Sequence, residues 1–342
     1  MIKKTILNKN LSRPNWVIQE HRNKNKLWLD KNECIDEKMN KIVLGALSKV
    51  SHDSVFSYPE LDVLYSKIAL FDNLHPENIL ITAGSDGAIR ACFEISIQPG
   101  DKIILTKPTF AMYDVYSRIY GAKVKWLDYK KSTDGPILNL DSIIKAIKNT
   151  NPKMLCLPNP NSPTGTVFSF KEIKKIISIA DANGTLIVID EAYYPFYSIS
   201  VSSLINKYKN LVVVRSFSKA WGAAGLRVGY ALANRYLISL LHKQRPMYEI
   251  GNVSAKSLEI LLNYEVEMKK SVKRLNEGKK YFQDSMRELG LSTYESFGNF
   301  FNVKFADHEN KVHEVLKNKV YYRKNFNLPC LKGYSRFSST TV

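Results

Sequence analysis

The chain has 342 residues, of which 44% are hydrophobic and 24% charged, so it is long enough for a large globular domain with a smaller one beside it. No apolar run approaches the about 18 residues that a membrane span needs. The net charge of +18 is dispersed and no nucleic-acid-binding motif accompanies it, which favours an anionic small molecule over nucleic acid as the partner. The four cysteines are widely spaced, which indicates buried free thiols and no metal site.

The first residues of the chain are polar and weakly patterned. We interpret them as an arm with Pro14 and Trp16 as its candidate anchors, and we assign residues 1–49 to this arm and part of a small domain. The stretch 30–33, Asp-Lys-Asn-Glu, follows a short apolar run and by itself fits an ordinary turn. The arm lacks the apolar segment and cleavage site of a secretory signal, so a cytoplasmic protein is expected.

Two helices are predicted before the first buried strand. Apolar residues recur at helical spacing over 42–50 and 61–71. Between these helices Pro59 restricts Tyr58 to an extended conformation. The sequence around Tyr58 alone is compatible with a side chain that only packs against its neighbours.

From residue 78 to about 235 the sequence alternates short apolar runs with helical stretches. Buried strands are predicted at 79–82, 103–105, 154–157, 186–189 and 211–214. The alternation predicts an α/β fold in which helices cover both faces of a mostly parallel sheet, giving three layers. Beyond Pro246 long amphipathic helices are followed by short strands, which indicates a smaller α+β domain. We therefore place a large domain at 50–245 and a small domain at 246–342.

Two features after the first strands suit a flat, phosphorylated ligand. The turn Ala83-Gly-Ser-Asp-Gly-Ala88 leads from a strand into a helix, and the N–H groups of a helix N-terminus favour a phosphate. Such a turn is more often an ordinary helix cap. Phe110, Tyr113 and Tyr116 follow the second strand at a spacing typical of core residues, although one of them could stack on a planar ring.

Polar residues also end the next two strands. The loop 159–165, Asn-Pro-Asn-Ser-Pro-Thr-Gly, contains enough chain-breaking residues to require an ordered conformation. Asp190 and Glu191 follow the apolar strand 186–189, where a carboxylate is costly to bury without a partner. A cationic ring nitrogen would be such a partner.

Lys219 follows the apolar run 211–214 and lies among small and hydroxyl residues. A lysine in a chain with 50 Lys and Arg is by default a surface residue, but these neighbours would desolvate its amine and favour the uncharged, nucleophilic form. Arg227, Ser216 and Ser218 would supply donors for a phosphate. We interpret Lys219 as a lysine that forms a Schiff base. Since the carboxyl ends of parallel strands meet at one edge, one site is expected to gather Gly84, Phe110, Asn161, Asp190 and Lys219.

In this order, these motifs resemble those of the fold-type I pyridoxal-phosphate (PLP) aminotransferases of class I and II. Within that superfamily they are most similar to the histidinol-phosphate aminotransferase family, and the resemblance covers nearly the whole chain, from Asp30 to Arg336. Its most specific parts are Asp-Glu-Ala-Tyr at 190–193 and Ser-Phe-Ser-Lys at 216–219 followed by Arg227. The resemblance implies pyridoxal 5'-phosphate as the cofactor, an amino donor and a 2-oxo acid as substrates, and a homodimer as the active unit.

The resemblance assigns three residues to catalysis. Lys219 is expected to bind the cofactor and move a proton between substrate and cofactor, Asp190 to keep the pyridine nitrogen protonated, and Tyr193 to donate to the phenolic oxygen. The other residues expected at the cofactor are Ser85, Asp86, Phe110, Asn161, Ser162, Ser216, Ser218 and Arg227, with Phe110 stacked on the ring.

The remaining assignments concern the substrate and the neighbouring subunit. Arg336 is expected to bind the anionic end of the substrate and Arg323 to help hold its phosphate, because a planar guanidinium suits either anion. Asn32 is also expected to bind the substrate. Tyr58 is expected to reach the phosphate of the cofactor in the neighbouring subunit.

Several positions depart from the family pattern. Ser162 stands where the family usually has the asparagine that binds the phenolic oxygen, and Asn161 precedes it, so either residue fits that role. Phe110 replaces the more common tyrosine, and Gly87 stands where an acidic residue is common. The stretch 245–249, Arg-Pro-Met-Tyr-Glu, also differs beside the expected substrate site.

The predicted function is that of a PLP-dependent aminotransferase with two half-reactions at one site. Histidinol phosphate is the first candidate for the amino donor, with a 2-oxo acid such as 2-oxoglutarate as the acceptor. Three alternatives stay open: an aminotransferase for another amino acid in a polysaccharide or secondary pathway, a decarboxylase of a phosphorylated amino acid, and an inactive paralogue.

Overall fold

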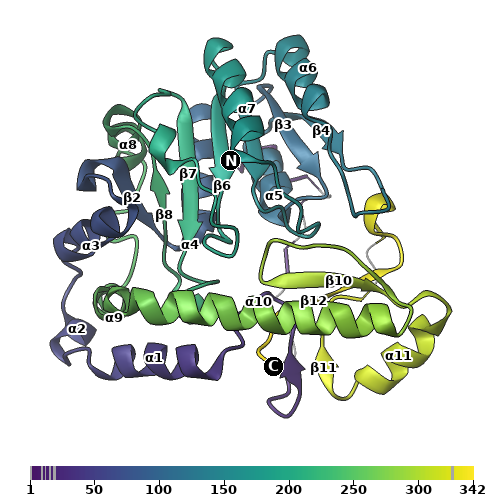
Figure 1. The fold of residues 1–342 in the computed structure, drawn as a ribbon. Helices are drawn as coiled ribbons and strands as arrows, with labels where there is room; N and C mark the ends of the chain where they lie inside the picture. The colour runs from purple at the N-terminus through teal and green to yellow at the C-terminus, as the bar shows by residue number, and fades with distance from the viewer. Residues whose placement is uncertain (1, 9–10, 12, 15–16, 18–20, 325–326) are drawn as a thin grey trace.

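The computed structural model describes residues 2–8, 11, 13–14, 17, 21–324 and 327–342. Figure 1 shows a large sheet between helices, with the long α10 (Glu265–Glu288) running across the molecule beneath it. The α/β fold with a mostly parallel sheet, expected from the sequence, is confirmed. Pro14 is exposed, whereas Trp16 lies outside the described residues. Among the described residues, no helix has the length and apolarity that a membrane crossing requires.

The central sheet has seven strands in the order β2-β8-β7-β6-β5-β3-β4, and only β8 runs against the others. Its strands are β2 (Ile79–Thr82), β3 (Lys102–Lys107), β4 (Lys123–Asp128), β5 (Met154–Pro158), β6 (Leu186–Asp190), β7 (Leu211–Ser216) and β8 (Gly229–Leu232). The inner strands consist largely of apolar residues because helices bury both faces of the sheet. The carboxyl ends of β2, β3, β5, β6 and β7 therefore lie along one edge.

Helices form a layer on each face of this sheet. One layer consists of α4 (Gly84–Ser96), α5 (Ala111–Ile119) and α8 (Arg235–His242). The other contains α3 (Asp62–Asp72), α6 (Leu140–Thr150) and α7 (Phe170–Ala182). Ile103 packs with the first layer and its neighbour Ile104 with the second, as expected when successive side chains of a strand point to opposite faces.

Three further helices enlarge the second layer. They are α1 (Glu37–Ser48), α2 (Asp53–Phe56) and α9 (Asn252–Leu261). Helix α9 packs against α1, α2 and α3. All four cysteines are buried and free, as predicted.

A smaller sheet lies on α10. It has the antiparallel order β12-β10-β9, and β1 pairs with β11 in a separate parallel ribbon. The elements are β1 (Leu27–Trp28), β9 (Ser292–Thr293), β10 (Phe300–Lys304), α11 (Glu309–Leu316), β11 (Val320–Tyr321) and β12 (Tyr334–Ser338). Phe282 of α10 packs against Phe301 and Phe337 of the sheet. This packing sets the position of Arg336 on β12.

Candidate active site

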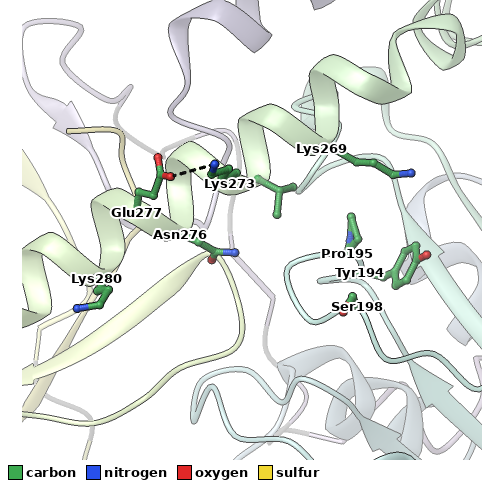
Figure 2. Close-up of a pocket in the computed structure, with 9 residues that line it drawn as sticks. Tyr194, Pro195, Ser198, Lys269, Lys273, Asn276, Glu277 and Lys280 are labelled. Atoms are coloured by element: carbon green, nitrogen blue, oxygen red, sulfur yellow. Dashed lines mark ion pairs between the residues drawn. The ribbon is translucent and has the colours of Figure 1, made fainter.

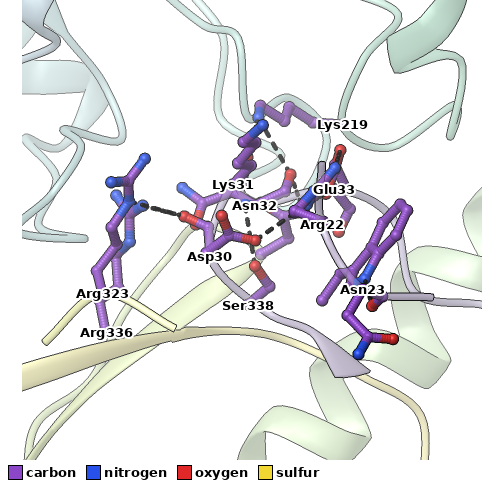
Figure 3. Close-up of polar contacts among 12 residues, drawn as sticks. Arg22, Asn23, Asp30, Lys31, Asn32, Glu33, Lys219, Arg323, Arg336 and Ser338 are labelled. Atoms are coloured by element: carbon purple, nitrogen blue, oxygen red, sulfur yellow. Dashed lines mark hydrogen bonds and ion pairs between the residues drawn. The ribbon is translucent and has the colours of Figure 1, made fainter. Parts of the chain in front are cut away.

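Lys219 lies three residues beyond β7, at the edge where the parallel strands end. Its Nζ donates hydrogen bonds to the main-chain carbonyls of Lys31 at 3.0 Å and Asn32 at 3.1 Å (Figure 3). The stretch 30–33 is therefore more than the ordinary turn that its sequence alone suggested, because it lies directly against Lys219.

The amine of Lys219 is easily deprotonated. Burial, helped by the positive charge of Arg336, lowers its pKa to about 8. A lysine with this pKa is uncharged far more often at neutral pH than a surface lysine. Lys219 thus has the property that a nucleophilic or proton-transferring amine requires.

Asp190 is the last residue of β6 and is 6% exposed. One carboxylate oxygen accepts from the Tyr113 hydroxyl at 2.9 Å and the other from the Ala192 N–H at 3.0 Å. Burial raises the pKa of Asp190 to about 6, although both hydrogen bonds oppose that rise. Within the described part of the chain no cation pairs with this carboxylate, whereas its neighbour Glu191 pairs with Arg215 at 3.0 Å. A cationic ring nitrogen fits the position of Asp190.

Tyr193 is buried close to both of these residues. Its hydroxyl accepts from the side-chain amide of Asn32 at 2.8 Å, and its ring centre lies 5.8 Å from Lys219 Nζ. Burial raises the pKa of Tyr193, so its O–H remains available as a donor. The structure thus brings together Lys219, Asp190, Tyr193 and Asn32.

A group of donors fit for a phosphate lies beside Lys219. Arg227 Nη1 is 3.4 Å from Ser218 Oγ, and Ser216 Oγ accepts from the Ser218 N–H at 3.1 Å. Arg227 also lies against the N-terminus of α4, since a Cβ added at Gly84 would be 2.7 Å from its Nη2. Gly84 has φ +76°, a conformation that favours glycine, and a larger residue there would also displace the end of the Arg227 side chain. Arg227, the two serines and the first turn of α4 form what we call the phosphate cup.

Two further residues expected at the cofactor border this cup. Ser85 and Asp86 lie in the first turn of α4, and Asp86 accepts from the Tyr116 hydroxyl at 3.1 Å. Phe110 immediately precedes α5 and is 40% exposed, with its ring edge-to-face with Tyr113 at 6.2 Å. Its partly exposed ring leaves a surface on which a flat ligand can stack.

The structure distinguishes Asn161 from Ser162. The amide nitrogen of Asn161 is fully engaged, because it donates to the Pro108 carbonyl at 3.0 Å and to Thr164 Oγ1 at 2.9 Å. Ser162 Oγ instead accepts from Arg336 Nη1 at 3.3 Å and bonds to the Tyr193 hydroxyl. Asn161 therefore holds the loop, and Ser162 faces the side chains expected to act in catalysis.

Arg336 and Arg323 lie side by side on paired strand segments. Both donate to the main-chain carbonyl of Asp30, Arg336 at 2.9 Å and Arg323 at 3.2 Å. Arg336 is buried, which lowers its pKa to about 10 and still leaves it charged at neutral pH, whereas Arg323 is exposed. The two guanidinium groups form a cationic wall facing the segment that contacts Lys219 (Figure 3).

Arg22 is a site residue that the sequence did not reveal. It donates to Asp30 at 3.0 Å and to both carboxylate oxygens of Glu33 at 2.7 and 2.8 Å, and it lies 4.0 Å above the Trp28 ring (Figure 3). Burial opposes the charge of Glu33, but these bonds outweigh it and lower the pKa of that carboxyl. Arg22 therefore fixes the stretch that contacts Lys219, and no motif in the sequence marks it.

Tyr58 does not join this group of side chains. It is 73% exposed and stacks on Tyr248, with ring centres 4.2 Å apart and planes 9° from parallel. Its expected role at the cofactor of a neighbouring subunit stays a prediction.

A separate cavity of about 640 Å³ lies between α10 and the loop after β6. Figure 2 shows Lys269, Lys273 and Lys280 on α10, with Tyr194 and Pro195 on the loop. The residues lining this cavity do not include those around Lys219, so it is not part of the candidate active site.

Comparison with known proteins gives the same family that the motifs indicated. The model of the family "Aminotransferase class I and II" matches residues 24–341. Histidinol-phosphate aminotransferase of Thermoanaerobacter sp. (strain X514) is 33% identical over 312 residues, which cover 91% of this chain and 87% of that protein. The enzyme of the same name from Sulfurisphaera tokodaii is 33% identical over 287 residues, covering 84% of this chain and 78% of the relative.

A solved structure shares the fold. The crystal structure of histidinol-phosphate aminotransferase from Sinorhizobium meliloti in complex with pyridoxal-5'-phosphate aligns with a TM-score of 0.81, at 20% identity, over 92% of this chain and 86% of that chain. The family match spans nearly the whole sequence and includes Lys219, Asp190, Tyr193 and Arg336, whereas Arg22 lies two residues before it. This chain therefore belongs to the class I and II aminotransferase family.

Proposed function

We propose that this protein is a PLP-dependent aminotransferase that takes histidinol phosphate as amino donor and a 2-oxo acid such as 2-oxoglutarate as acceptor. The observation that carries the proposal is the placement of a half-buried lysine with a pKa of about 8 beside a buried aspartate, at the edge of the sheet that also holds the phosphate cup. The names of the relatives with 33% identity support histidinol phosphate as the first candidate.

The residues present fit PLP. The phosphate cup supplies a guanidinium, two hydroxyls and a helix N-terminus for the phosphate. The Asp190 carboxylate suits a protonated ring nitrogen, and Phe110 presents its ring to a flat cofactor. Bound PLP supplies an electron-accepting ring that stabilises negative charge on a substrate carbon.

Lys219 is proposed to hold the cofactor covalently and to serve as the base. With the amine free, Lys219 would take the proton from the α-carbon of the substrate and deliver it to the cofactor, so that the lysine itself ends the half-reaction unchanged. A pKa of about 8 suits both directions of this transfer near neutral pH. Tyr193 donates to the phenolic oxygen of the cofactor, because its own raised pKa keeps its proton in place.

Arg336 and Arg323 are proposed to bind the anionic end of both substrates. The carbonyl of Asp30 accepts from both guanidinium groups, so an anion that replaces it meets two cations already oriented. A phosphate and a carboxylate present similar oxygen acceptors to a planar guanidinium. One pair of arginines therefore serves two chemically different substrates.

A half-reaction screen tests the proposed function. PLP-loaded protein is mixed with one amine at a time, namely histidinol phosphate, glutamate or a panel of amino acids, and the change in visible absorbance is recorded. We expect responses to histidinol phosphate and to glutamate. A response to another amine without a response to histidinol phosphate would show that histidinol phosphate is not the substrate. Release of CO₂ from a phosphorylated amino acid would instead identify a decarboxylase.

Ser162 and Asn161 are expected to respond differently to alanine substitution. Ser162→Ala removes the hydroxyl between Arg336 and Tyr193, and we expect kcat/KM to fall roughly tenfold with Tm unchanged. Asn161→Ala leaves the Pro108 carbonyl without its donor and removes one of the bonds to Thr164, so we expect a loss of about 1–3 kcal/mol in the free energy of unfolding. Steady-state kinetics and thermal unfolding of both variants measure the difference. If Asn161→Ala lowers kcat/KM and Ser162→Ala lowers only stability, Asn161 is the residue that binds the phenolic oxygen of the cofactor.

We further propose that the active unit is a homodimer to which Tyr58 contributes across the interface. Exposed apolar side chains surround this tyrosine on the surface that joins α2 to the 245–249 loop, where Phe56 is 74% and Met247 78% exposed. A second copy of the chain would bury these side chains together with the stacked Tyr58 and Tyr248.

A further inference from the structure

The aromatic residues of α5 do more than fill the core. Tyr113 and Tyr116 are three residues apart and so share one face of the helix. The Tyr113 hydroxyl donates to Asp190 at 2.9 Å and the Tyr116 hydroxyl donates to Asp86 at 3.1 Å. Two successive turns of α5 thus each hold one carboxylate of the candidate active site.

The contact between Tyr113 and Asp190 is fully enclosed. The Tyr113 ring is 0% exposed and lies in the apolar layer beneath the sheet with Phe93 and Cys156. Burial raises the pKa of Tyr113 well above its ordinary value, so its hydroxyl keeps its proton. With the Ala192 N–H on the other oxygen, both oxygens of the carboxylate have a fixed donor.

We propose that Tyr113 is a positioning residue, whose hydroxyl keeps the Asp190 carboxylate ionised and in one orientation for a cationic ring nitrogen. This inference rests on the proposed PLP-dependent function. Tyr113 acts through Asp190, and its contribution is a hydrogen bond that is stronger to the ionised than to the protonated carboxyl group.

The surroundings of Asp190 otherwise oppose its charge. The titratable groups that face it from the neighbouring elements are Asp86 on α4, Tyr113 on α5, Cys156 on β5, Glu191 and Tyr193 after β6, and Lys219 after β7. Burial raises the pKa of Asp190 to about 6, and Glu191 and Asp86 raise it as well. The hydrogen bonds from the Ala192 N–H and the Tyr113 hydroxyl lower this pKa. If the hydroxyl is removed, the Ala192 N–H is the one remaining donor that opposes the effect of burial.

The raised pKa of Asp190 makes the stability of the folded apoprotein depend on pH. Because the pKa of Asp190 is higher in the folded than in the unfolded protein, the folded apoprotein binds more protons between about pH 4 and about pH 6. The stabilisation from this proton is lost as the pH rises through that interval. Without the Tyr113 hydroxyl, the upper end of the interval moves to higher pH.

Tyr113→Phe tests the proposal, because it removes the hydroxyl and keeps the ring. Tyr116→Phe is the matched control, since it removes the same group one turn along α5. The infrared band of the protonated Asp190 carboxyl is titrated in the apoprotein, with Asp190→Asn to assign the band. The Kd of PLP is measured at pH 6 and pH 8 for the loaded protein.

In Tyr113→Phe we expect the Asp190 midpoint to rise by about one pH unit or more. If PLP binds the ionised form, the Kd then rises about fivefold at pH 6 and hardly changes at pH 8. Tyr116→Phe should leave the Asp190 midpoint in place. An unchanged midpoint in Tyr113→Phe would overturn the proposal, and so would a Kd that weakens equally at both pH values.

Failure of the proposed function and failure of the role of Tyr113 give different experimental results. If wild-type protein does not bind PLP, the proposed function is wrong, while the infrared titration still reports whether Tyr113 controls the ionisation of Asp190. If wild-type protein binds PLP and the midpoint does not move, only the role of Tyr113 is wrong.

Discussion

Replacement of Lys219 by alanine is expected to lower the turnover of histidinol phosphate and 2-oxoglutarate by at least about 10⁴-fold. The substitution removes both the covalent attachment of the cofactor and the amine that moves the proton. Product formation in a coupled assay measures the loss. PLP should still bind, because the phosphate cup, Asp190 and Phe110 do not depend on Lys219.

Borohydride reduction separates attachment from binding. After reduction, a tryptic peptide of the wild type should carry the mass of PLP at Lys219, and no peptide of Lys219→Ala should do so. Lys175→Ala, which removes an exposed lysine of α7, serves as the matched control and should label and turn over as the wild type does. Retained turnover in Lys219→Ala, or reduction onto another lysine, would refute the assignment.

Replacement of Arg215 by alanine is expected to destabilise the protein by about 3–5 kcal/mol. Arg215 on β7 is 3% exposed and pairs with Asp72 of α3 and with Glu191, whose carboxylate lies 3.0 Å away. The variant would leave both buried carboxylates without their cation. Since the whole free energy of unfolding of a protein is typically about 5–15 kcal/mol, this loss should be obvious in urea unfolding of the apoprotein.

Two further variants define the origin of that loss. Arg118→Ala breaks a half-exposed ion pair with Asp114 on α5 and should cost under about 0.5 kcal/mol. Adding Asp72→Asn and Glu191→Gln to Arg215→Met should recover much of the stability, because no buried charge then lacks a partner. Arg215→Ala within about 1 kcal/mol of the wild type would mean that water or another cation replaces the guanidinium.

The strand ends of the sheet were predictable because buried parallel strands are continuous apolar runs. Such runs precede Gly84, Asp190 and Lys219, and the topology brings their ends to one edge. Other elements gave no such signal. In β4 (Lys123–Asp128) polar residues alternate with apolar ones, as suits an edge strand, and β8 (Gly229–Leu232) contains glycine and alanine and no β-branched residue. Neither strand was therefore predictable from an apolar run.

Side-chain partners were less predictable than strand ends, because they depend on residues far apart in the chain. Tyr113 and Asp190 are 77 positions apart, and the helical spacing of Tyr113 was equally compatible with a core residue. Arg22 belongs to no recognisable sequence motif, and its hydrogen bond to Glu33 is seen only in the folded structure. Periodicity shows which way a side chain points within an element, whereas packing decides which hydroxyl or guanidinium it meets.

The choice between Asn161 and Ser162 shows the same limit. Both are polar residues in one ordered loop, and an asparagine is the usual donor in the family that the chain resembles. The structure separates them because Pro108 and Thr164 already occupy the amide of Asn161. The hydroxyl of Ser162 is therefore the better candidate for the contact with the phenolic oxygen, because the donors of Asn161 are already used.

In the substrate-binding mode proposed above, the carbonyl group of Asp30 takes the place of a substrate oxygen, and the carbonyl groups of Lys31 and Asn32 hold Lys219 beside it. These three consecutive neutral acceptors hold Arg323, Arg336 and Lys219, which would otherwise repel one another. A charged phosphate or carboxylate is the stronger acceptor and can exchange with the Asp30 carbonyl while the guanidinium groups stay in place. Binding then needs little ordering of side chains, and affinity depends on the difference between two acceptors at one position.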